Sequence, residues 1–594
     1  MALVARLAAA EPAPDAQDWS MYNHDVAGSR ANGGETSINP TNAGRLQEKW
    51  RFPPRGSATQ IGVIHATPVV VNGHVYFGTA TDPAFYKLCP DGTLAWMYRN
   101  PRYGQVEQSE PQSNAERNAR FQSAANGVMA SALVSEDTVY FGDLGGSFYA
   151  LDRTSGAERW KIDARSKKFP GSHSLNVFFA SPIPADGKLI VAGGTIEQVV
   201  SALPLYRGNN GRGFVMALDP KDGQIVWKYD VGPKPEPLDP PITIRDTWGE
   251  HVFYFGPGTS CVWSTPSYDA ASKTIFFGTD VNTAPRRPTA DNPRLATDES
   301  CAVIALDVGD GHEKWITQLN AGDVWTMGMR AYDPADGRYK DQSIGDTPKV
   351  YRIETGGQTT TVVGVGCKNG GFYVLRADDG DIVAQTPVYA GPPSYPLMPA
   401  PDRRMLALPS PIGGLQTGCA TDGQTIFANG IDALRMGTQE TRPASASPPT
   451  GGRVTAISID TRHERWRHER PKVAELGGPP PKPVYRDVGD PVASGIAVAN
   501  GVVYFTTVAS GRLVALDAQN GSVLTEIELG PVWAGPSVSR GRVYVGTGNT
   551  LLTPLDFEGY FPKQRTGALY SFGLPGEDEV QRMGQGTESG PATP

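Results

Sequence analysis

The cysteines and histidines, the residues that most often bind transition metals or act as nucleophiles, are few and scattered in this chain. There are five cysteines and eight histidines in 594 residues. No CxxC, CxxCH, HExxH or GxSxG pattern occurs, so no signature of a zinc cluster, a c-type haem attachment, a zinc protease or a serine hydrolase is present. We expect Cys89, Cys261, Cys301, Cys367 and Cys419 to be mostly buried small hydrophobic residues, with at least one free thiol because their number is odd.

Composition excludes several classes of partner. The chain has 54 Lys and Arg against 62 Asp and Glu, a formal net charge of −8, and it has no run of basic residues. Phosphate contacts need clustered positive charge, so a nucleic-acid partner is not expected. No stretch approaches the roughly 20 apolar residues that a bilayer span requires, so no membrane span is expected either. The 69 glycines and 51 prolines indicate a globular, turn-rich chain.

The elements that must position any site are repeats. Each copy has alternating apolar residues, Leu-Asp or its equivalent, a polar turn with glycine and, in most copies, a tryptophan. The copies end at Trp96, Trp160, Trp227, Trp315, Ala384, Trp466 and Thr525. Two shorter apolar runs separated by a turn precede most copies. Together they predict a four-stranded antiparallel sheet, which is the blade of a β-propeller.

The two ends of the chain supply one more blade. The last set of strands, around Trp533, Tyr544 and 567–572, lacks a Trp-bearing strand, whereas residues 46–52 around Trp50 form such a strand with no partners before it. Joining them would close the ring and remove both free sheet edges. The sequence therefore predicts an all-β, eight-bladed propeller with four-stranded antiparallel blades over residues 18–575, with a flexible tail at 576–594.

Residues 1–17 are expected to be a leader or the remnant of a signal. The Ala-rich run at 3–10 resembles the end of a secretory signal, which would direct the protein to the periplasm, and a disordered leader is the alternative. Long connections at 98–125, 283–299, 389–412, 436–450 and 470–491 exceed ordinary loop lengths. Several of them on one face would build a funnel over the axis.

The opening phrase Asp-Trp-Ser-Met-Tyr-Asn-His-Asp at 18–25, followed by the Trp50 strand, resembles the start of the pyrroloquinoline quinone (PQQ) dependent alcohol dehydrogenases. The resemblance covers nearly the whole chain and is greatest to polyvinyl-alcohol-dehydrogenase-like members without a haem domain. It implies PQQ on the propeller axis and a divalent cation, normally Ca²⁺, beside it.

The resemblance also implies metal ligands. Glu197 follows Gly194 and Thr195, two residues expected at the cofactor, and falls at the family's acidic ligand. Carboxylate and amide oxygens suit Ca²⁺, whereas a solvated loop glutamate is the alternative. Asn282 or Asp280 would be the second ligand, because Asp-Val-Asn replaces the family's Gly-Asn here.

Trp263 matches the indole under the quinone in this family. It precedes a strand pair, unlike the tryptophans of the repeats, and a flat aromatic cofactor gains from stacking on an indole. Asp323 is the expected catalytic base and a further metal ligand. It is the carboxylate nearest in sequence to Trp325, and Thr326 stands where the family has aspartate.

Lys368 matches the family's basic residue at the quinone carbonyls, where a cation stabilises the developing negative charge. A turn lysine in water is the alternative. Trp533 precedes the strands of the last blade as Trp263 precedes its own, and we expect it to bind the cofactor too.

The resemblance implies a PQQ- and Ca²⁺-dependent alcohol dehydrogenase. The alcohol would be oxidised to the ketone or aldehyde, and the long loops favour a bulky secondary alcohol, such as a polymer or a polycyclic trichothecene. Because no CxxCH occurs, electrons would pass to a separate acceptor such as cytochrome c or a dye. The alternative is a non-catalytic scaffold of the outer-membrane-assembly type, which would need neither Glu197 nor Trp263 nor Lys368.

Overall fold

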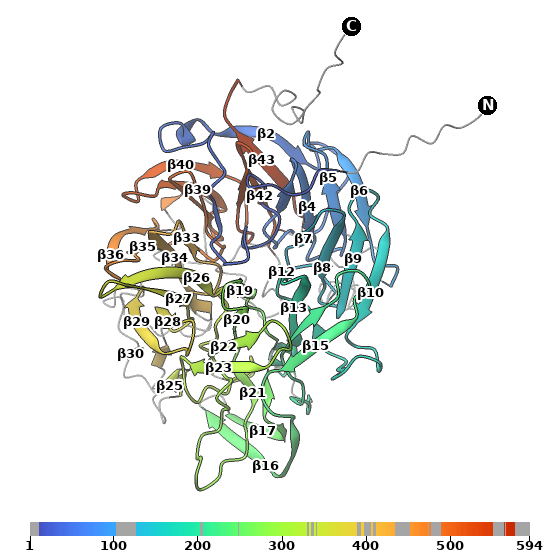
Figure 1. The fold of residues 1–594 in the computed structure, drawn as a ribbon, viewed down its shortest axis with the longest axis vertical. Coiled ribbons are helices and arrows are strands. Elements are labelled where there is room, and N and C mark those ends of the chain that lie inside the picture. The colour runs from blue at the N-terminus through green and yellow to red at the C-terminus, as the bar shows by residue number, and fades with distance from the viewer. Residues whose placement is uncertain are drawn as a thin grey trace, which may run out of the picture.

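The computed structural model of the protein describes residues 11–102, 126–201, 206–246, 249–259, 261–329, 332–333, 338–339, 341–388, 394–396, 405–407, 412–433, 452–472, 475–476, 489–549, 564 and 566–576. Its strands form a ring of eight antiparallel sheets around a central axis (Figure 1). The predicted all-β, eight-bladed propeller is confirmed.

The first four blades follow one another along the chain. Blade 1 has β3 (Val69–Val71), β4 (His74–Gly78), β5 (Phe85–Leu88) and β6 (Leu94–Tyr98). Blade 2 has β7 (Leu133–Val134), β8 (Thr138–Gly142), β9 (Ser147–Asp152) and β10 (Glu158–Asp163). Blade 3 has β12 (Ile183–Ala185), β13 (Lys188–Thr195), β14 (Phe214–Leu218) and β15 (Ile225–Asp230), with the short β11 (Asn176–Val177) on β13. Blade 4 has β19 (Ser267–Asp269), β20 (Thr274–Gly278), β22 (Ala302–Asp307) and β23 (Glu313–Gln318).

The second half of the ring repeats this order. Blade 5 has β26 (Lys349–Thr355), β27 (Gln358–Gly366), β28 (Gly371–Arg376) and β29 (Ile382–Pro387). Blade 6 has β33 (Ala420–Thr421), β34 (Thr425–Ala433), β35 (Gly452–Ser458) and β36 (Glu464–Glu469), with β32 (Ile412–Gly414) on β34. Blade 7 has β37 (Ala497–Ala499), β38 (Val502–Thr506), β39 (Arg512–Asp517) and β40 (Val523–Glu528). Blade 8 has β41 (Ser537–Ser539), β42 (Arg542–Gly546) and β43 (Leu569–Gly573).

An N-terminal strand closes the ring. Strand β2 (Gln47–Phe52) pairs antiparallel with β43, so that Trp50 lies opposite Ser571. Figure 1 shows the blue β2 beside the red β43. A second N-terminal strand, β1 (Ala31–Asn32), runs parallel to β37 on blade 7. The closure predicted from the unpaired Trp50 strand is confirmed.

The tryptophan of each repeat joins its blade to the next. Trp227 Nε1 donates to the carbonyl of Val308 (3.0 Å) in blade 4. Its ring covers Gly311, where φ is +75° and a Cβ would lie 2.5 Å from the indole. A side chain would therefore clash, and the positive φ also favours glycine. The same pairing recurs for Trp50, Trp96, Trp160, Trp315 and Trp466 with Gly92, Gly156, Gly223, Gly380 and Gly521.

Two joints differ from these six. The position occupied by Trp315 in β23 is Ala384 in β29 and Thr525 in β40, as the strand registers show. The joints from blade 5 to blade 6 and from blade 7 to blade 8 therefore have no indole at this position.

Hydroxyl groups link the blades near the axis. Ser131 Oγ donates to the carbonyl of Thr67 (2.8 Å), and Ser181 Oγ accepts the Ser131 N–H (2.9 Å). Thr265 Oγ1 in turn accepts the Ser181 N–H (3.2 Å). These bonds satisfy buried backbone groups ahead of the first strands and fix the inner ends of blades 1 to 4.

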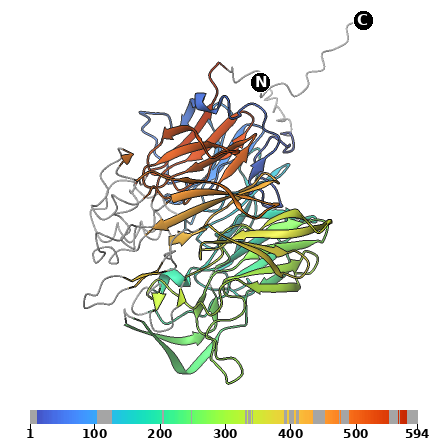
Figure 2. The same cartoon turned by 90° about the vertical axis from the view of Figure 1, so that its left-hand side faces the viewer.

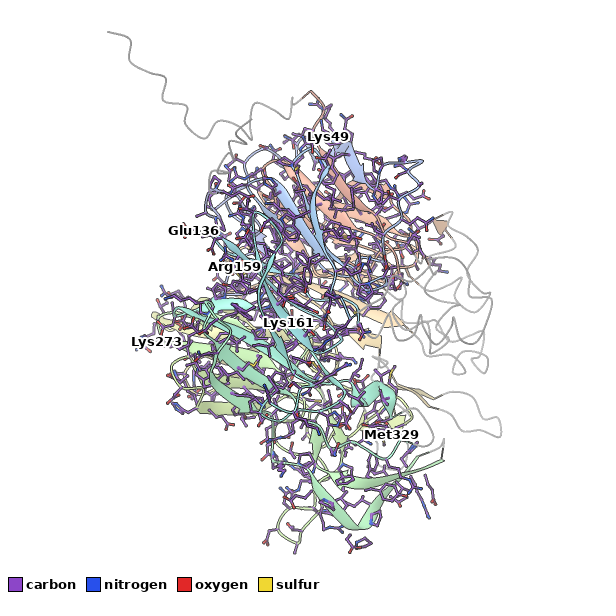
Figure 3. The ribbon with its side chains drawn as sticks, turned by 90° about the vertical axis from the view of Figure 1, so that its right-hand side faces the viewer. Lys49, Glu136, Arg159, Lys161, Lys273 and Met329 are labelled. Carbon is purple, nitrogen blue, oxygen red and sulfur yellow. The ribbon has the colours of Figure 1, made fainter. Side chains whose placement is uncertain are left out.

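A long hairpin lies between blades 3 and 4. Its strands β16 (Glu236–Asp246) and β17 (Gly249–Gly256) project from the ring (Figures 1 and 2). Figure 3 views the ring from its edge, with Arg159 and Lys161 of β10 facing the viewer and Met329 toward this hairpin.

Short elements complete the fold: β18 (Gly258–Thr259) with β21 (Asn282–Ala284), β24 (Tyr332–Asp333) with β25 (Arg338–Tyr339), β30 (Ser394–Pro396) with β31 (Met405–Ala407), and the helices η1 (Ala43–Arg45) and α2 (Glu197–Val200). Among the described residues no helix is long and apolar enough to cross a membrane. Of the predicted long connections, 283–299 is described, and the larger parts of the others lie outside the described residues.

The expected leader reaches the propeller. Glu11 pairs with Lys87, and its other oxygen lies 3.1 Å from Arg153 Nε, two cations that are almost wholly buried. Most of the expected tail lies outside the described residues. The five cysteines are free, and all but Cys89 are buried.

Candidate functional site

A cavity of about 330 Å³ lies among the inner ends of the blades. Equivalent residues of the blades can be recognised in the segment before the first strand of each blade. Each lies toward the axis, two positions before a residue that is mostly threonine, serine or glycine. Seven of these residues line the cavity: His65, Met129, Phe179, Trp263, Gly345, Thr417 and Trp533. The repeat thus gives seven of the eight blades one residue at this position with which to shape the cavity.

The two tryptophans of this set come from blades 4 and 8, which stand opposite each other in an eight-bladed ring. Trp263 extends over Gly345 of the neighbouring blade, because a Cβ on that glycine would lie 1.8 Å from Cη2 of the indole. Gly345 therefore leaves the space that the Trp263 ring occupies. Trp263 and Trp533, both predicted to bind a cofactor, lie in the cavity wall.

Four polar side chains meet in the wall formed by blades 3 to 5. Lys368 Nζ lies 2.8 Å from Asp341 Oδ2 in a nearly buried ion pair. Gln198 Nε2 lies 3.4 Å from Asp341 Oδ1 and 3.5 Å from Asp280 Oδ1, so the amide bridges the two carboxylates. All four side chains line the cavity. A lysine and two carboxylates at one point can hold a proton, a cation or a polarised carbonyl.

Burial raises the pKa of Asp341 to about 7. The Lys368 ammonium opposes this rise, whereas the negative charges of Asp280 and Asp323 add to it. A carboxyl group with a pKa near neutrality can accept and release a proton under physiological conditions.

The structure places Asp323, the predicted base, behind this wall. Its Oδ1 accepts the N–H of Asp341 (3.1 Å) and its Oδ2 accepts that of Gln342 (2.8 Å). Asp323 is 2% exposed and is not among the cavity-lining residues. Its carboxylate positions the backbone that carries Asp341 toward the cavity.

Asp341 is not among the site residues predicted from the sequence. The prediction of Asp323 rests on its nearness in sequence to Trp325, and Asp341 is 16 positions beyond that tryptophan. The sequence does indicate that Asp341 lies near the cavity, because Asp341 is four residues before Gly345, in the segment that approaches the axis ahead of the blade 5 strands. The matching segment of blade 4 carries Cys261, which also lines the cavity.

The other predicted metal ligands lie at different depths. Glu197 is fully buried, and its carboxylate accepts the N–H groups of Asn209 (2.7 Å) and Gly211 (2.6 Å) instead of facing the cavity. The Asn282 amide donates to the carbonyl of Gly258 (2.9 Å). Asp280 is the member of the predicted ligand set that lines the cavity. The metal-binding roles of Glu197, Asn282 and Asp323 stay predictions.

The donor set of the cavity suits a hard cation. Asp280 and Asp341 offer carboxylate oxygens, which Ca²⁺ prefers, whereas Gln198 turns its amide nitrogen toward both of them. In the part of the chain that the structure describes, no three or more His, Cys, Asp or Glu residues are grouped as a metal site. A cation here would therefore depend on amide oxygens or on oxygens of a ligand in addition to these carboxylates.

The two remaining predicted residues end β13, just before α2. Thr195 lines the cavity. Gly194 lies behind it with φ +150°, and a Cβ there would come within 2.8 Å of the Cα atoms of Cys261 and Gly213. Gly194 thus permits close backbone packing under the wall, while Thr195 presents its side chain to the cavity.

An apolar surface borders the polar cluster. Ile196 lies just before α2 and Val199 follows Gln198 within it, and the Met327 N–H donates to the Gln198 carbonyl (3.0 Å). Trp325 and Met327 line the cavity beside them. A ligand whose polar group reaches Asp341 would therefore place its carbon skeleton against apolar side chains.

Comparison with known proteins identifies related chains. The family model for the glucose/ethanol/alcohol dehydrogenase β-propeller domain that uses PQQ matches residues 19–394, and that for the outer membrane protein assembly factor BamB matches 450–559. A polyvinylalcohol dehydrogenase from Sphingopyxis sp. (strain 113P3) is 24% identical over 532 residues, covering 85% of this chain and 68% of its own. A quinohemoprotein alcohol dehydrogenase from Comamonas testosteroni is 24% identical, covering 96% and 78%.

Solved structures share the fold. The crystal structure of the quinohemoprotein alcohol dehydrogenase from Comamonas testosteroni superposes with a TM-score of 0.66 at 19% identity, covering 95% of this chain and 81% of that chain. A europium-containing methanol dehydrogenase gives 0.62 at 17% identity, covering 94% and 98%. With the family model matching more than half of its length, the chain belongs to the PQQ-dependent alcohol dehydrogenase family, a family of β-propeller oxidoreductases.

Proposed function

We propose that this protein oxidises bulky secondary alcohols to ketones with PQQ and Ca²⁺ in the axial cavity. The observation that carries the proposal is the Asp341–Lys368 ion pair in the wall of a cavity that Trp263 also lines. A proton acceptor, a cation and a flat aromatic surface are the groups that alcohol oxidation by a quinone requires from a protein.

The residues present fit the cofactor. The space left by Gly345 holds the Trp263 indole, a surface on which a planar ring system can stack. Lys368 supplies positive charge for a quinone oxygen. The carboxylates of Asp280 and Asp341 would hold Ca²⁺.

Each side chain then has a distinct task. Asp341 accepts the proton of the substrate hydroxyl while Asp323 fixes the backbone that carries it. Lys368 holds Asp341 in place and keeps a positive charge at the reacting end of the cavity. When bound, PQQ supplies the acceptor for the hydride of the alcohol carbon and Ca²⁺ supplies Lewis acidity.

The apolar wall supports the substrate class. Ile196, Val199 and Met327 lie next to the carboxylates, so both carbon substituents of a secondary alcohol would meet apolar surface. Two relatives are named polyvinylalcohol dehydrogenase, and the repeating unit of that polymer is a secondary alcohol. A polymer segment and a polycyclic alcohol such as a trichothecene both meet this description.

Electrons would leave to a separate carrier, for which cytochrome c is our proposal. A relative from Pseudomonas sp., 26% identical over 309 residues and covering 44% of this chain, is named lupanine 17-hydroxylase [cytochrome c]. We place the reaction in the periplasm on the basis of the Ala-rich N-terminal sequence.

The test is dye reduction by the apo-protein with and without PQQ and Ca²⁺, using primary, secondary and polycyclic alcohols. Activity should require both additions and should favour secondary alcohols. Asp341→Asn should lower kcat by about 10²- to 10⁴-fold while PQQ still quenches tryptophan fluorescence. Asp323→Asn, the matched control, should cost less because one backbone hydrogen bond survives.

Two results would contradict the proposal. Full activity in Asp341→Asn together with loss in Asp323→Asn would return the base to Asp323. Absence of both PQQ binding and turnover in the wild type would favour the non-catalytic scaffold.

A further inference from the structure

His65 is a buried polar residue whose hydrogen-bonding capacity the protein does not use. It is 8% exposed and lines the axial cavity. Among the described residues, neither Nδ1 nor Nε2 has a hydrogen-bond partner. Its ring stacks on Trp533 with centroids 6.3 Å apart and planes inclined by 21°. Buried polar groups of native proteins are almost always paired, so an unpaired imidazole in a cavity wall indicates a partner that enters the cavity.

The ring symmetry shows which end of a ligand His65 would meet. His65 comes from blade 1, whereas Gly345 holds the equivalent position in blade 5, directly across an eight-bladed ring. Lys368 and Asp341 belong to the blade 5 side. A planar ligand with its reactive end at this ion pair would therefore turn its opposite edge toward His65.

The surroundings of His65 are apolar or neutral. Trp533 covers one face, and Ala66 and Thr67 follow it in the chain. Arg30 reaches Thr67 Oγ1 (3.4 Å) from another segment, and its guanidinium also donates to the carbonyls of Ile496 (2.6 Å) and Tyr22 (2.6 Å). Burial lowers the pKa of His65 to about 3, so the imidazole is neutral at physiological pH and has one donor and one acceptor nitrogen.

We propose that His65 is a cofactor-binding residue whose imidazole N–H donates a hydrogen bond to a carboxylate of PQQ, across the axis from the Lys368–Asp341 pair. This inference rests on the proposed function. PQQ carries three carboxylates on its fused rings in addition to the quinone. A carboxylate is the strongest hydrogen-bond acceptor available to a buried N–H, and the bond removes the cost of leaving that donor unpaired.

The experiment is a PQQ titration of the apo-protein in the presence of Ca²⁺, followed by tryptophan fluorescence and calorimetry. His65→Leu should weaken PQQ binding by about 10- to 100-fold, the range for a hydrogen bond to a charged group. His65→Gln keeps a side-chain N–H donor and should recover most of the affinity. His312→Leu, on an exposed turn, is the control and should bind PQQ as the wild type does.

Thermal unfolding of the apo-proteins separates this role from a structural one. His65→Leu removes two unpaired buried nitrogens and should unfold at the wild-type temperature or above it. Wild-type affinity in His65→Leu would overturn the inference. So would a parallel loss of stability and affinity that His65→Gln does not repair. If the wild type itself failed to bind PQQ, the proposed function would fall, and that result is distinguishable from both of these.

Discussion

The pH dependence of stability gives a direct test of the environment of His65. Burial lowers its pKa to about 3 in the folded protein from the ordinary histidine value of 6.5. Between these two values the unfolded chain binds a proton that the folded chain does not. The stability associated with the neutral imidazole is therefore fully present above pH 6.5 and is lost as the pH falls toward 3.

The magnitude follows from the linkage relation, in which each pH unit within this window changes the free energy of unfolding by about 1.4 kcal/mol. Between pH 7 and pH 5 the contribution of His65 amounts to about 2 kcal/mol. His65→Leu has no proton to bind, so its loss of stability between these two values should be smaller than that of the wild type by this amount.

The assay is urea unfolding of the apo-protein at pH 7 and pH 5, monitored by tryptophan fluorescence, for the wild type and His65→Leu. Phe178→Leu is the control, because it alters a fully buried core residue that does not titrate. It should lower stability at both pH values and leave their difference unchanged. An equal difference between the two pH values in the wild type and in His65→Leu would show that the imidazole is solvated or paired, and the reasoning about the cavity would fail.

Three further predictions concern packing and charge. Trp227→Ala should destabilise the protein by about 3–5 kcal/mol, because it empties a blade joint, and a change under 1 kcal/mol in chemical unfolding would contradict the role of the joints. Asp346→Ala should cost about 3–5 kcal/mol, since it leaves the wholly buried Lys349 ammonium unpaired, and the double variant with Lys349→Met should recover part of this loss in thermal unfolding. Gly345→Ala should displace the Trp263 ring and weaken PQQ binding in fluorescence titration, whereas unchanged affinity would show that the indole does not contact the cofactor.

The fold could be read from the sequence because its determinants are local and periodic. Each blade carries its own strand pattern, turn and tryptophan, and Trp50 lacked partners that only the C-terminal strands could supply. Trp263 and Lys368, which the resemblance to the quinoprotein family assigned to the cofactor, both line the cavity.

The polar end of the site could not be read in this way. Asp323 and Asp341 lie in a connection that is not part of the repeat. Which of the two carboxylates faces the cavity depends on which one accepts hydrogen bonds from backbone N–H groups. Glu197 shows the same effect, since the loop at 209–211 turns its N–H groups onto it. Hydrogen bonds between segments far apart in sequence decide these orientations, and no pattern within either segment reports them.

The uneven joints between blades also bear on how the ring opens. The indole that clamps six of the joints is replaced by Ala384 between blades 5 and 6 and by Thr525 between blades 7 and 8. Blades 6 and 7 are thus bounded on both sides by joints that lack the indole, and β1 pairs with β37 at the inner edge of blade 7. Thermal fluctuations should separate these two blades from the other six before any other two neighbouring blades separate. Amide hydrogens of β29 and β40 should therefore exchange with solvent before those of β15 and β23.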